Sequence, residues 1–380
     1  MSHIEFLTNW DWDRERPNSY PSHVTLWGTS GRAARAPRML CYAAMSVWTS
    51  LLQNAIHSPS PHNVQPWRVR ILSDLEADLL IDSQRTLPKE DPTGSFIILT
   101  MGMFIEALRL LAANQGLRLE HSLYHEPAWY ALEILKTREH TLFPFARMSL
   151  ARDESVLSSF DPALLLKRRT ARITLQPDLL PDHTVQHFKA LAHQWEQRYE
   201  QTTDPLLIER ILAKNTEALF ADLNDRNYHD EIVEWFRFTD AAAQATRDGL
   251  DYRCMNTSRS AYWLSARLPK LLELPVARTI LARTYRSQLG LVPTIGMLAG
   301  QFWEPANAFK TGSFLMQFWL ETARHNLYIH PYGNLVTNKT ASAWLQQETG
   351  IDNIWLIFKI GYSREPPKSY RRSVEEVLVA

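Results

Sequence analysis

The sequence predicts an α+β fold made of two halves that repeat one order of elements: a helix, a pair of strands, a long central helix and a further strand. The first observation is an apolar stretch from about residue 94 to 116, which follows the turn Asp91-Pro92-Thr93 and is apolar on most helical faces. The second is the segment 308–326, which has the same character and is also followed within a few residues by an apolar run. Sequence identity between the halves is weak, so the predicted repetition is one of structure.

Five further elements are predicted in the first half. A helix is expected over 43–56, where apolar residues have helical spacing and no breaker interrupts them. A strand is expected over 67–72, where apolar and polar residues alternate. More strands are expected near 77–81, 118–123 and 130–135.

In the second half, a strong strand is predicted over 354–362 and a mostly helical region over 178–290. A linker with few structural signals precedes them at roughly 150–162. We therefore expect three parts: an N-terminal arm rich in tryptophan (1–39), a first half (40–155), and a second half (156–380) with a helical insertion at about 200–300.

The first candidate site is the loop that joins the predicted helix to the predicted strand, Ser58-Pro59-Ser60-Pro61-His62-Asn63-Val64-Gln65-Pro66-Trp67. Its three prolines disfavour a helix and push the preceding residues toward extended geometry. Ser60, Asn63 and Gln65 place a hydroxyl and two amides on this stiff, neutral loop, which suits an uncharged planar ligand rich in donors and acceptors. The alternative, a simple proline-rich connector, is disfavoured by the spacing of Asn, Gln and Trp.

The second candidate site is the basic run Lys167-Arg168-Arg169-Thr170-Ala171-Arg172, at the end of a predicted short helix. Four cations and a hydroxyl within six residues indicate a local anion site, because arginine forks match phosphate oxygens in a bidentate manner. The alternative is a solvated basic cluster, which is the usual meaning of a charge run.

Both patterns resemble motifs of one family. Pro-Ser-x-x-Asn-x-Gln-Pro-Trp followed by a strand resembles the flavin loop of the nitroreductases, and in its fuller form it is most similar to the tandem, Acg-type branch. Arg-Arg-Thr-x-Arg is similar to the Arg-x-Ser-x-Arg phosphate motif of the same family. The resemblance covers most of 40–135, 160–175 and 308–380. It implies a three-layer α/β/α fold in which two nitroreductase-like halves are fused into a pseudo-dimer.

In homodimeric members of that family, one subunit supplies the phosphate arginines and the other supplies the Ser/Asn loop. A chain that keeps one motif in each half is therefore expected to bind one FMN. The resemblance assigns the phosphate and ribityl chain to four arginines and a threonine: Arg168, Thr170, Arg172, Arg371 and Arg372.

The resemblance also assigns residues to the flavin ring. Those expected to reach the isoalloxazine and ribityl from the other half are Pro59, Ser60, Asn63 and Gln65. In the turn 331–334, Tyr332 and Gly333 stand where the family offers backbone N–H groups to flavin N5 and O4.

No catalytic side chain and no metal ligand is expected in addition. The flavin performs the redox chemistry, and no Ser-His-Asp or Cys-His arrangement stands out. The spacing His183-x-x-x-His187 places two imidazoles on one helical face, but the glutamate of a zinc hydrolase and a third ligand are not evident, so two surface histidines are the preferred interpretation.

The composition of the chain argues against nucleic acid and membranes as binding partners. Lys plus Arg and Asp plus Glu number 41 each, so no global field favours nucleic acid or an anionic membrane. The apolar stretch 96–113 contains Glu106 and Arg109, and it is too short and too charged to be expected to span a bilayer. The acidic start, without an apolar core, and two cysteines far apart (Cys41 and Cys254) predict a cytoplasmic protein with reduced thiols.

The leading functional hypothesis is an FMN-dependent oxidoreductase that takes electrons from NAD(P)H and reduces a nitro-aromatic, a quinone or another acceptor. The alternative is an Acg-like flavin-sequestering protein with little turnover, in which the insertion and the N-terminal arm act as lids. A third, remote interpretation is an interaction module that uses exposed tryptophans and holds no cofactor. The expected state is a monomeric pseudo-dimer or a weak homo-oligomer.

Overall fold

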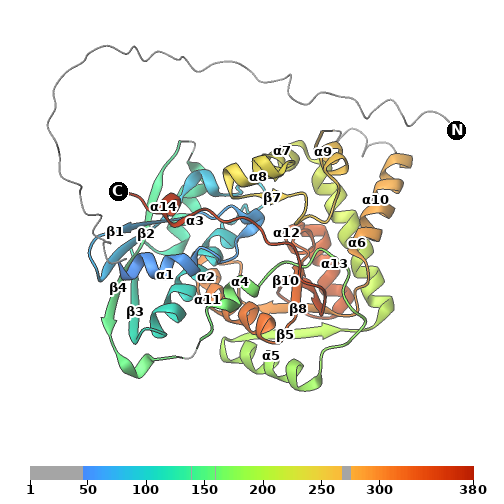
Figure 1. Cartoon of the computed structure of the whole chain (residues 1–380). Helices are drawn as coiled ribbons and strands as arrows, with labels where there is room; N and C mark the ends of the chain where they lie inside the picture. The colour runs from blue at the N-terminus through green and yellow to red at the C-terminus, as the bar shows by residue number, and fades with distance from the viewer. Residues whose placement is uncertain (1–45, 138, 159, 268–274) are drawn as a thin grey trace, which may run out of the picture. The chain divides into compact units, whose positions relative to one another are not determined.

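The computed structural model describes residues 46–380 apart from 138, 159 and 268–274, so the predicted arm (1–39) and Cys41 lie outside the described residues. Two antiparallel four-stranded sheets organise the described part (Figure 1). The first sheet has the order β1-β2-β4-β3, with strands Trp67–Ile71, Glu76–Asp82, Leu142–Arg152 and Leu117–Leu123. The second has the order β5-β8-β10-β9, with strands Gln197–Thr202, Ile295–Gly300, Ile354–Gly361 and Tyr328–Pro331.

The two sheets have the same connectivity. When the strands of each sheet are numbered in chain order, both read first, second, fourth, third, and every neighbouring pair is antiparallel. The helices of the first half are α1 (Val47–Ala55), α2 (Ser95–Ala113) and α3 (Pro127–Lys136). The helices that follow up to β5 are α4 (Ala163–Lys167) and α5 (Asp182–Gln194).

Between β5 and β8 the chain forms a run of helices with one small parallel strand pair. These elements are α6 (Pro205–Asn224), α7 (Arg226–Glu234), β6 (Phe236–Arg237), α8 (Asp240–Thr246), β7 (Leu250–Asp251), α9 (Arg259–Arg267) and α10 (Pro275–Leu289). The rest of the second half contains α11 (Pro305–Arg324), α12 (Asn334–Thr337), α13 (Lys339–Thr349) and α14 (Val374–Val377). The predicted helical character of 178–290 is thus confirmed for most of its described residues.

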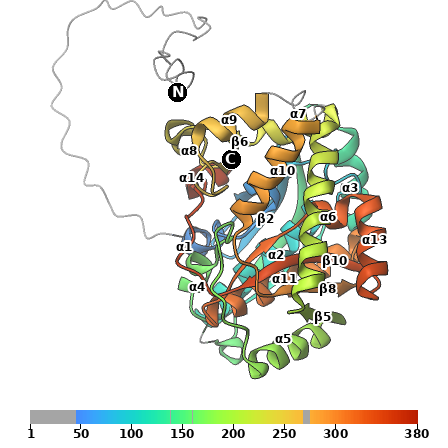
Figure 2. The same cartoon turned by 90° about the vertical axis from the view of Figure 1, so that its right-hand side faces the viewer.

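The central helices α2 and α11 cross at close range, as Figures 1 and 2 both show. The contact is made by two glycines, because a Cβ at Gly102 would lie 2.2 Å from Phe309 O and a Cβ at Gly312 would lie 2.3 Å from Leu99 O. Both apolar helices thus bury against each other within one chain. Among the described residues, α2 is the one helix long and apolar enough to cross a membrane, and most of it is buried inside the core.

The second sheet is buried on both faces, which produces a helix–sheet–helix arrangement. Leu298 on β8 and Phe358 on β10 face α11, whereas Met297 and Ile357 face a second apolar cluster formed with α6 and α13. The outer face of the first sheet is polar instead. Ion pairs there join groups such as Arg68 to Asp82 at 2.9 Å.

After β10 the chain returns to the first half and ends against β1. Val379 N donates to Val69 O at 2.9 Å, and Arg70 Nε donates to Ala380 O at 2.9 Å. The return of the C-terminal segment places the predicted arginines Arg371 and Arg372 beside the loop that precedes β1.

One prediction in the first half is wrong and one strand was not predicted. The strand expected at 130–135 is helix α3, whose buried residues Tyr130, Ala131 and Ile134 have helical spacing. Strand β4, which no prediction included, extends into the first residues of the linker expected at 150–162, and the described residues from 153 to 162 contain one 3₁₀ turn and no longer element. A register shift opposite Leu79 and Leu80 buries neighbouring residues of β4 and hides its alternation.

The glycine crossing leads to a stability prediction. Gly312→Ala should lower the free energy of unfolding by about 1 kcal/mol, because overpacking against a backbone oxygen costs ~1–3 kcal/mol and outweighs the gain in helix propensity of ~1 kcal/mol. Gly333→Ala is the matched control, since Gly333 has helical geometry and no atom within 4 Å of an added Cβ. Urea unfolding of both variants measures the difference, and equal midpoints would show that the crossing tolerates a methyl group.

Candidate functional site

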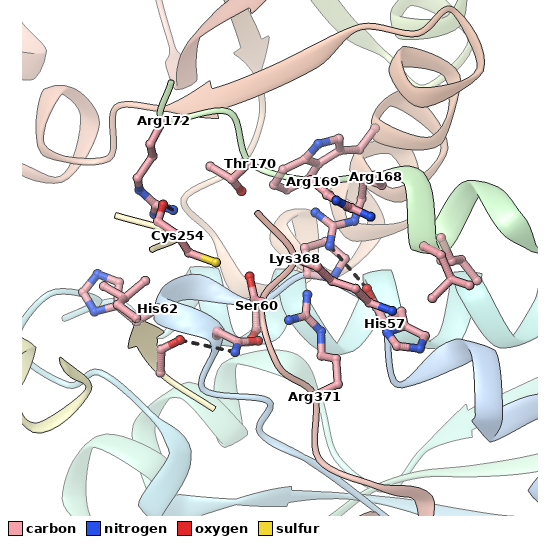
Figure 3. Close-up of a pocket in the computed structure, with 18 residues that line it drawn as sticks. His57, Ser60, His62, Arg168, Arg169, Thr170, Arg172, Cys254, Lys368 and Arg371 are labelled. Atoms are coloured by element: carbon pink, nitrogen blue, oxygen red, sulfur yellow. Dashed lines mark hydrogen bonds between the residues drawn. The ribbon is translucent and has the colours of Figure 1, made fainter. Parts of the chain in front are cut away.

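A cavity that is partly open to solvent lies where the two halves, the inserted helices and the returning C-terminal segment meet. Its lining comes from four separate stretches and one residue of α11, namely 57–63, 165–172, 249–254, 368–371 and Trp319. Figure 3 shows Arg168, Thr170 and Arg172 on one side of the cavity and Ser60 and Arg371 on the facing side.

The cavity is strongly cationic. Its charged lining residues are Arg168, Arg169, Arg172, Lys368 and Arg371. No Asp or Glu occurs among the described residues that line it. In a chain with no net charge, this local excess of cations favours an anion as the ligand of the cavity.

Arg168 is held at the centre of this cationic wall. Its guanidinium lies 4.6 Å from the centroid of the Trp319 ring and donates from Nη2 to His57 O at 3.3 Å. Burial and the neighbouring charge of Arg371 lower the pKa of Arg168 to about 9. Burial likewise lowers the pKa of Arg371 to about 10.

The positive electrostatic potential of the cavity also acts on His57. Burial, together with the charges of Arg371, Lys368 and Arg168, lowers the pKa of His57 to about 3. The imidazole is therefore neutral across the physiological pH range and cannot balance or add to the charge. An anion that binds between these positively charged side chains would reduce their mutual electrostatic repulsion.

Several buried polar atoms at the cavity have no partner among the described residues. They are Asn63 Oδ1 and the Nε atoms of Arg168, Arg169 and Arg371. Buried donors and acceptors in proteins are almost always satisfied, so a group of them around one cavity indicates a missing hydrogen-bonding ligand. Arg169 differs from the others because its guanidinium also pairs with Glu365 at 2.6 Å.

The loop before β1 is more constrained than the sequence suggests. It contains a single 3₁₀ turn at Pro61–Asn63, which Pro61 can start because a first-turn proline needs no N–H partner. His62, Asn63 and Gln65 have φ values of 45°, 57° and 53°, which is the left-handed region. Such backbone geometry costs of order 1–3 kcal/mol for each residue and concentrates at functional sites.

Hydrogen bonds to two other parts of the chain, the insertion and the C-terminal segment, hold this loop. Asn63 Nδ2 donates to Gly249 O at 3.3 Å and to Tyr370 O at 3.0 Å. Gln65 Nε2 donates to Arg247 O at 2.9 Å, and Gln65 Oε1 accepts from Arg372 N at 2.9 Å. The amide nitrogen of Asn63 is thus used within the protein, and its Oδ1 is the atom left for a ligand.

The segment that carries the basic motif is anchored to the second sheet. Thr170 forms an isolated bridge with Ile329 of β9, and Ala171 N donates to Ile329 O at 2.9 Å. Arg172 points deeper and donates from Nη1 to Cys254 O at 3.4 Å. Behind it, burial and the charge of Arg172 lower the pKa of Lys359 to about 7.

The structure brings seven of the eleven predicted cofactor residues to the cavity: Pro59, Ser60, Asn63, Arg168, Thr170, Arg172 and Arg371. The other four do not line it. Gln65 and Arg372 are buried beside it and hydrogen-bond to each other. Tyr332 packs in the second apolar cluster, and Gly333 caps α12 with open space where a side chain would be.

Sequence reasoning missed several lining residues. Lys368 and Ser369 stand next to the predicted Arg371 in a basic run, so that run was a usable signal. Trp319 and Cys254 gave no signal, because a tryptophan in an apolar helix and a lone cysteine both read as core residues.

Neither a protein-family model nor a curated protein matches the chain. Solved structures that resemble it include an FMN-dependent nitroreductase of Mycobacterium smegmatis in complex with NADPH. The sequence identity is 15%, the match covers 55% of this chain and 93% of that chain, and the TM-score is 0.31. A nitroreductase of Desulfitobacterium hafniense with bound FMN has 10% identity, coverage of 57% and 95%, and a TM-score of 0.34. A putative nitroreductase of Anabaena variabilis has 11% identity, coverage of 76% and 69%, and a TM-score of 0.38. TM-scores below 0.5 give these likenesses no weight in the argument.

The uncompensated charge of the cavity leads to a prediction for the ligand-free protein. Arg371→Met should leave the unfolding midpoint unchanged or raise it, because it removes a buried cation that no described carboxylate at the cavity balances. Inorganic phosphate should stabilise the wild type more than the variant, by about 1.5–3 kcal/mol at saturation, the contribution of one charge-assisted contact. Thermal unfolding with and without phosphate measures both effects.

Arg364→Met is the control for this experiment, since Arg364 is exposed and does not line the cavity. Equal phosphate stabilisation in wild type and Arg371→Met would contradict the assignment of this wall to an anion.

Proposed function

We propose that the cavity holds FMN and that the chain is an FMN-dependent oxidoreductase of the nitroreductase type, using NAD(P)H as electron donor and a nitro-aromatic, a quinone or another oxidised compound as acceptor. One observation carries the proposal. The two stretches whose sequences resemble the family's flavin and phosphate motifs, 59–65 and 168–172, are more than a hundred residues apart in sequence, and both contribute to the lining of one cationic cavity.

The residues present fit this cofactor. FMN carries a phosphate, and the cavity offers Arg168, Lys368 and Arg371 without a described carboxylate to compete. The flavin ring is planar and rich in donors and acceptors, and the opposite wall offers Ser60 and the unpartnered Oδ1 of Asn63. When bound, FMN supplies two-electron transfer between the nicotinamide donor and the acceptor.

The protein's own contribution is binding, orientation and charge. Arg168, fixed on the Trp319 ring, and Arg371, on the returning segment, would hold the phosphate from opposite sides. Arg172 would place a positive charge beside the ring system, where it favours the more negative reduced form. His57 is neutral, so it would position groups through hydrogen bonds and would not act as a proton donor.

The proposal includes a fused pseudo-dimer of two nitroreductase-like halves, 40–155 and 156–380, with the helices between β5 and β8 as the insertion. The shared strand order of the two sheets and the crossing of α2 with α11 support it. In this interpretation one half supplies the loop and the other supplies the arginines, so one chain needs no second subunit to complete the site.

A second candidate function is flavin sequestration with little turnover. The observation that favours it is the contribution of the insertion to the cavity wall, where Gly249, Leu250 and Cys254 line the cavity. Asn63 and Gly249 are also joined by hydrogen bonds in both directions, Asn63 Nδ2 to Gly249 O and Gly249 N to Asn63 O, each at 3.3 Å. An insertion attached to the flavin loop in this way would restrict access of a donor.

The cofactor assignment predicts one FMN for each chain and a clear effect of Arg168. Arg168→Ala should weaken FMN binding by roughly one to two orders of magnitude, because a charge-assisted hydrogen bond contributes about 1.5–3 kcal/mol and 1.4 kcal/mol corresponds to tenfold. Quenching of flavin fluorescence during titration gives the affinity and the stoichiometry. Arg198→Ala, an exposed arginine on β5, is the control. Unchanged affinity in Arg168→Ala, or two flavins for each chain, would overturn the assignment.

The two candidate functions predict different rates for the reduction of the bound flavin by NADPH or NADH. We expect anaerobic mixing with NADPH or NADH in a stopped-flow instrument to bleach the flavin absorbance within seconds if the chain is a reductase. Titanium(III) citrate, a small chemical reductant, serves as the control for a reducible flavin. Bleaching by that reductant but not by either nicotinamide would establish the sequestering function instead.

A further inference from the structure

A second polar cluster lies where α5 packs against the C-terminal end of α11, the two helices seen side by side in Figures 1 and 2. We propose that His187, Glu321 and His325 form a binding site for a divalent transition-metal cation such as Zn²⁺. One ligand atom from each residue lies within 4.8 Å of the others. None of the three lines the cationic cavity, so this site is separate from the one proposed for FMN.

The distances suit a small cation. His187 Nε2 lies 3.3 Å from Glu321 Oε2, and the rings of His187 and His325 have centroids 5.6 Å apart. Zinc binds histidine nitrogen and carboxylate oxygen at ~2.0–2.2 Å, so ligand atoms around a tetrahedral ion are about 3.3–3.5 Å apart. The His187–Glu321 pair already has that separation, and the remaining ligand atoms, which lie within 4.8 Å of one another, need to approach by up to about 1.5 Å.

The helical spacing orients the ligands. Glu321 and His325 are four residues apart at the end of α11, and residues at this spacing lie on the same helical face. His187 faces them from α5, and His183 stands one turn before it. The sequence alone shows the two histidines of α5 but not the ligands on α11, because those are 134 residues further along the chain.

The Glu321 carboxylate is also oriented by a neighbouring side chain. Glu321 Oε1 accepts from Arg324 Nε at 3.0 Å, which fixes the carboxylate and leaves Oε2 directed at His187. A hydrogen-bonded ligating carboxylate of this kind is typical of metal sites.

The donor set defines the class of cation. Two imidazoles and one carboxylate favour Zn²⁺, Cu²⁺ or Ni²⁺ over Mg²⁺ and Ca²⁺, which prefer all-oxygen sites. The ligands come from two helices, so a bound ion would join α5 to α11 and stabilise the folded chain in proportion to its occupancy.

Zinc titration of the untagged full chain, first treated with a chelator, tests the proposal by calorimetry. We expect one site with micromolar affinity, insensitive to millimolar Mg²⁺, and a higher unfolding temperature in the presence of Zn²⁺. His187→Ala and Glu321→Gln should each lower the affinity at least tenfold, and the second change keeps the shape of the side chain in case the first disturbs packing.

His193→Ala is the matched control, because His193 is an exposed histidine near the end of the same helix and lies outside the cluster. It should retain wild-type affinity and wild-type stabilisation by zinc. The proposal is overturned if the wild type shows no zinc site, or if His187→Ala and Glu321→Gln bind zinc as the control does. These outcomes are independent of FMN, so they do not depend on the function proposed above.

Discussion

The close crossing of α2 and α11 is the contact on which the rest of the fold depends. Backbone meets backbone there because Gly102 and Gly312 have no side chains, and each helix then carries its own four-stranded sheet. Beside the crossing, the buried carboxylate of Glu106 accepts from Arg109 Nε at 2.8 Å and from Gln317 Nε2 at 2.6 Å. The crossing sets how near the loop of one half comes to the arginines of the other, and therefore the width of the cavity.

The cavity shows the usual conflict between stability and binding. Arg168 is buried and the other arginines of the cavity are partly buried, with little compensation, which raises the free energy of the ligand-free chain, and the loop beside the cavity has three residues with left-handed geometry. The rest of the molecule offsets this with a continuous apolar core that extends across both sheets. A site that is unfavourable when vacant is well suited to select an anion, because the binding energy includes the relief of that repulsion.

Much of the scaffold was predictable because its signals are local. The alternation in β1, the apolar length of α2 and the two motifs are each read within about twenty residues, and the structure has the predicted elements. The missed or mistaken parts depend on distant contacts. The bulge in β4 is imposed by β2, and Tyr332 is drawn into the apolar cluster by α6 and α13. The lining by Gly249 follows from the path of the insertion, which no local pattern encodes.

The return of the C-terminal segment to β1 has a consequence for the order of events during synthesis. Asn63 bonds to Tyr370 across 307 residues, and Lys368 and Arg371 complete a wall that the loop before β1 begins. A growing chain therefore has no complete cavity until these late residues leave the ribosome and cross back. Contacts of such long range form late in folding, because their loop-closure entropy must be overcome first. Ligand uptake at this cavity would accordingly mark a chain that has finished folding, and chains that stall or end before residue 368 would remain unloaded.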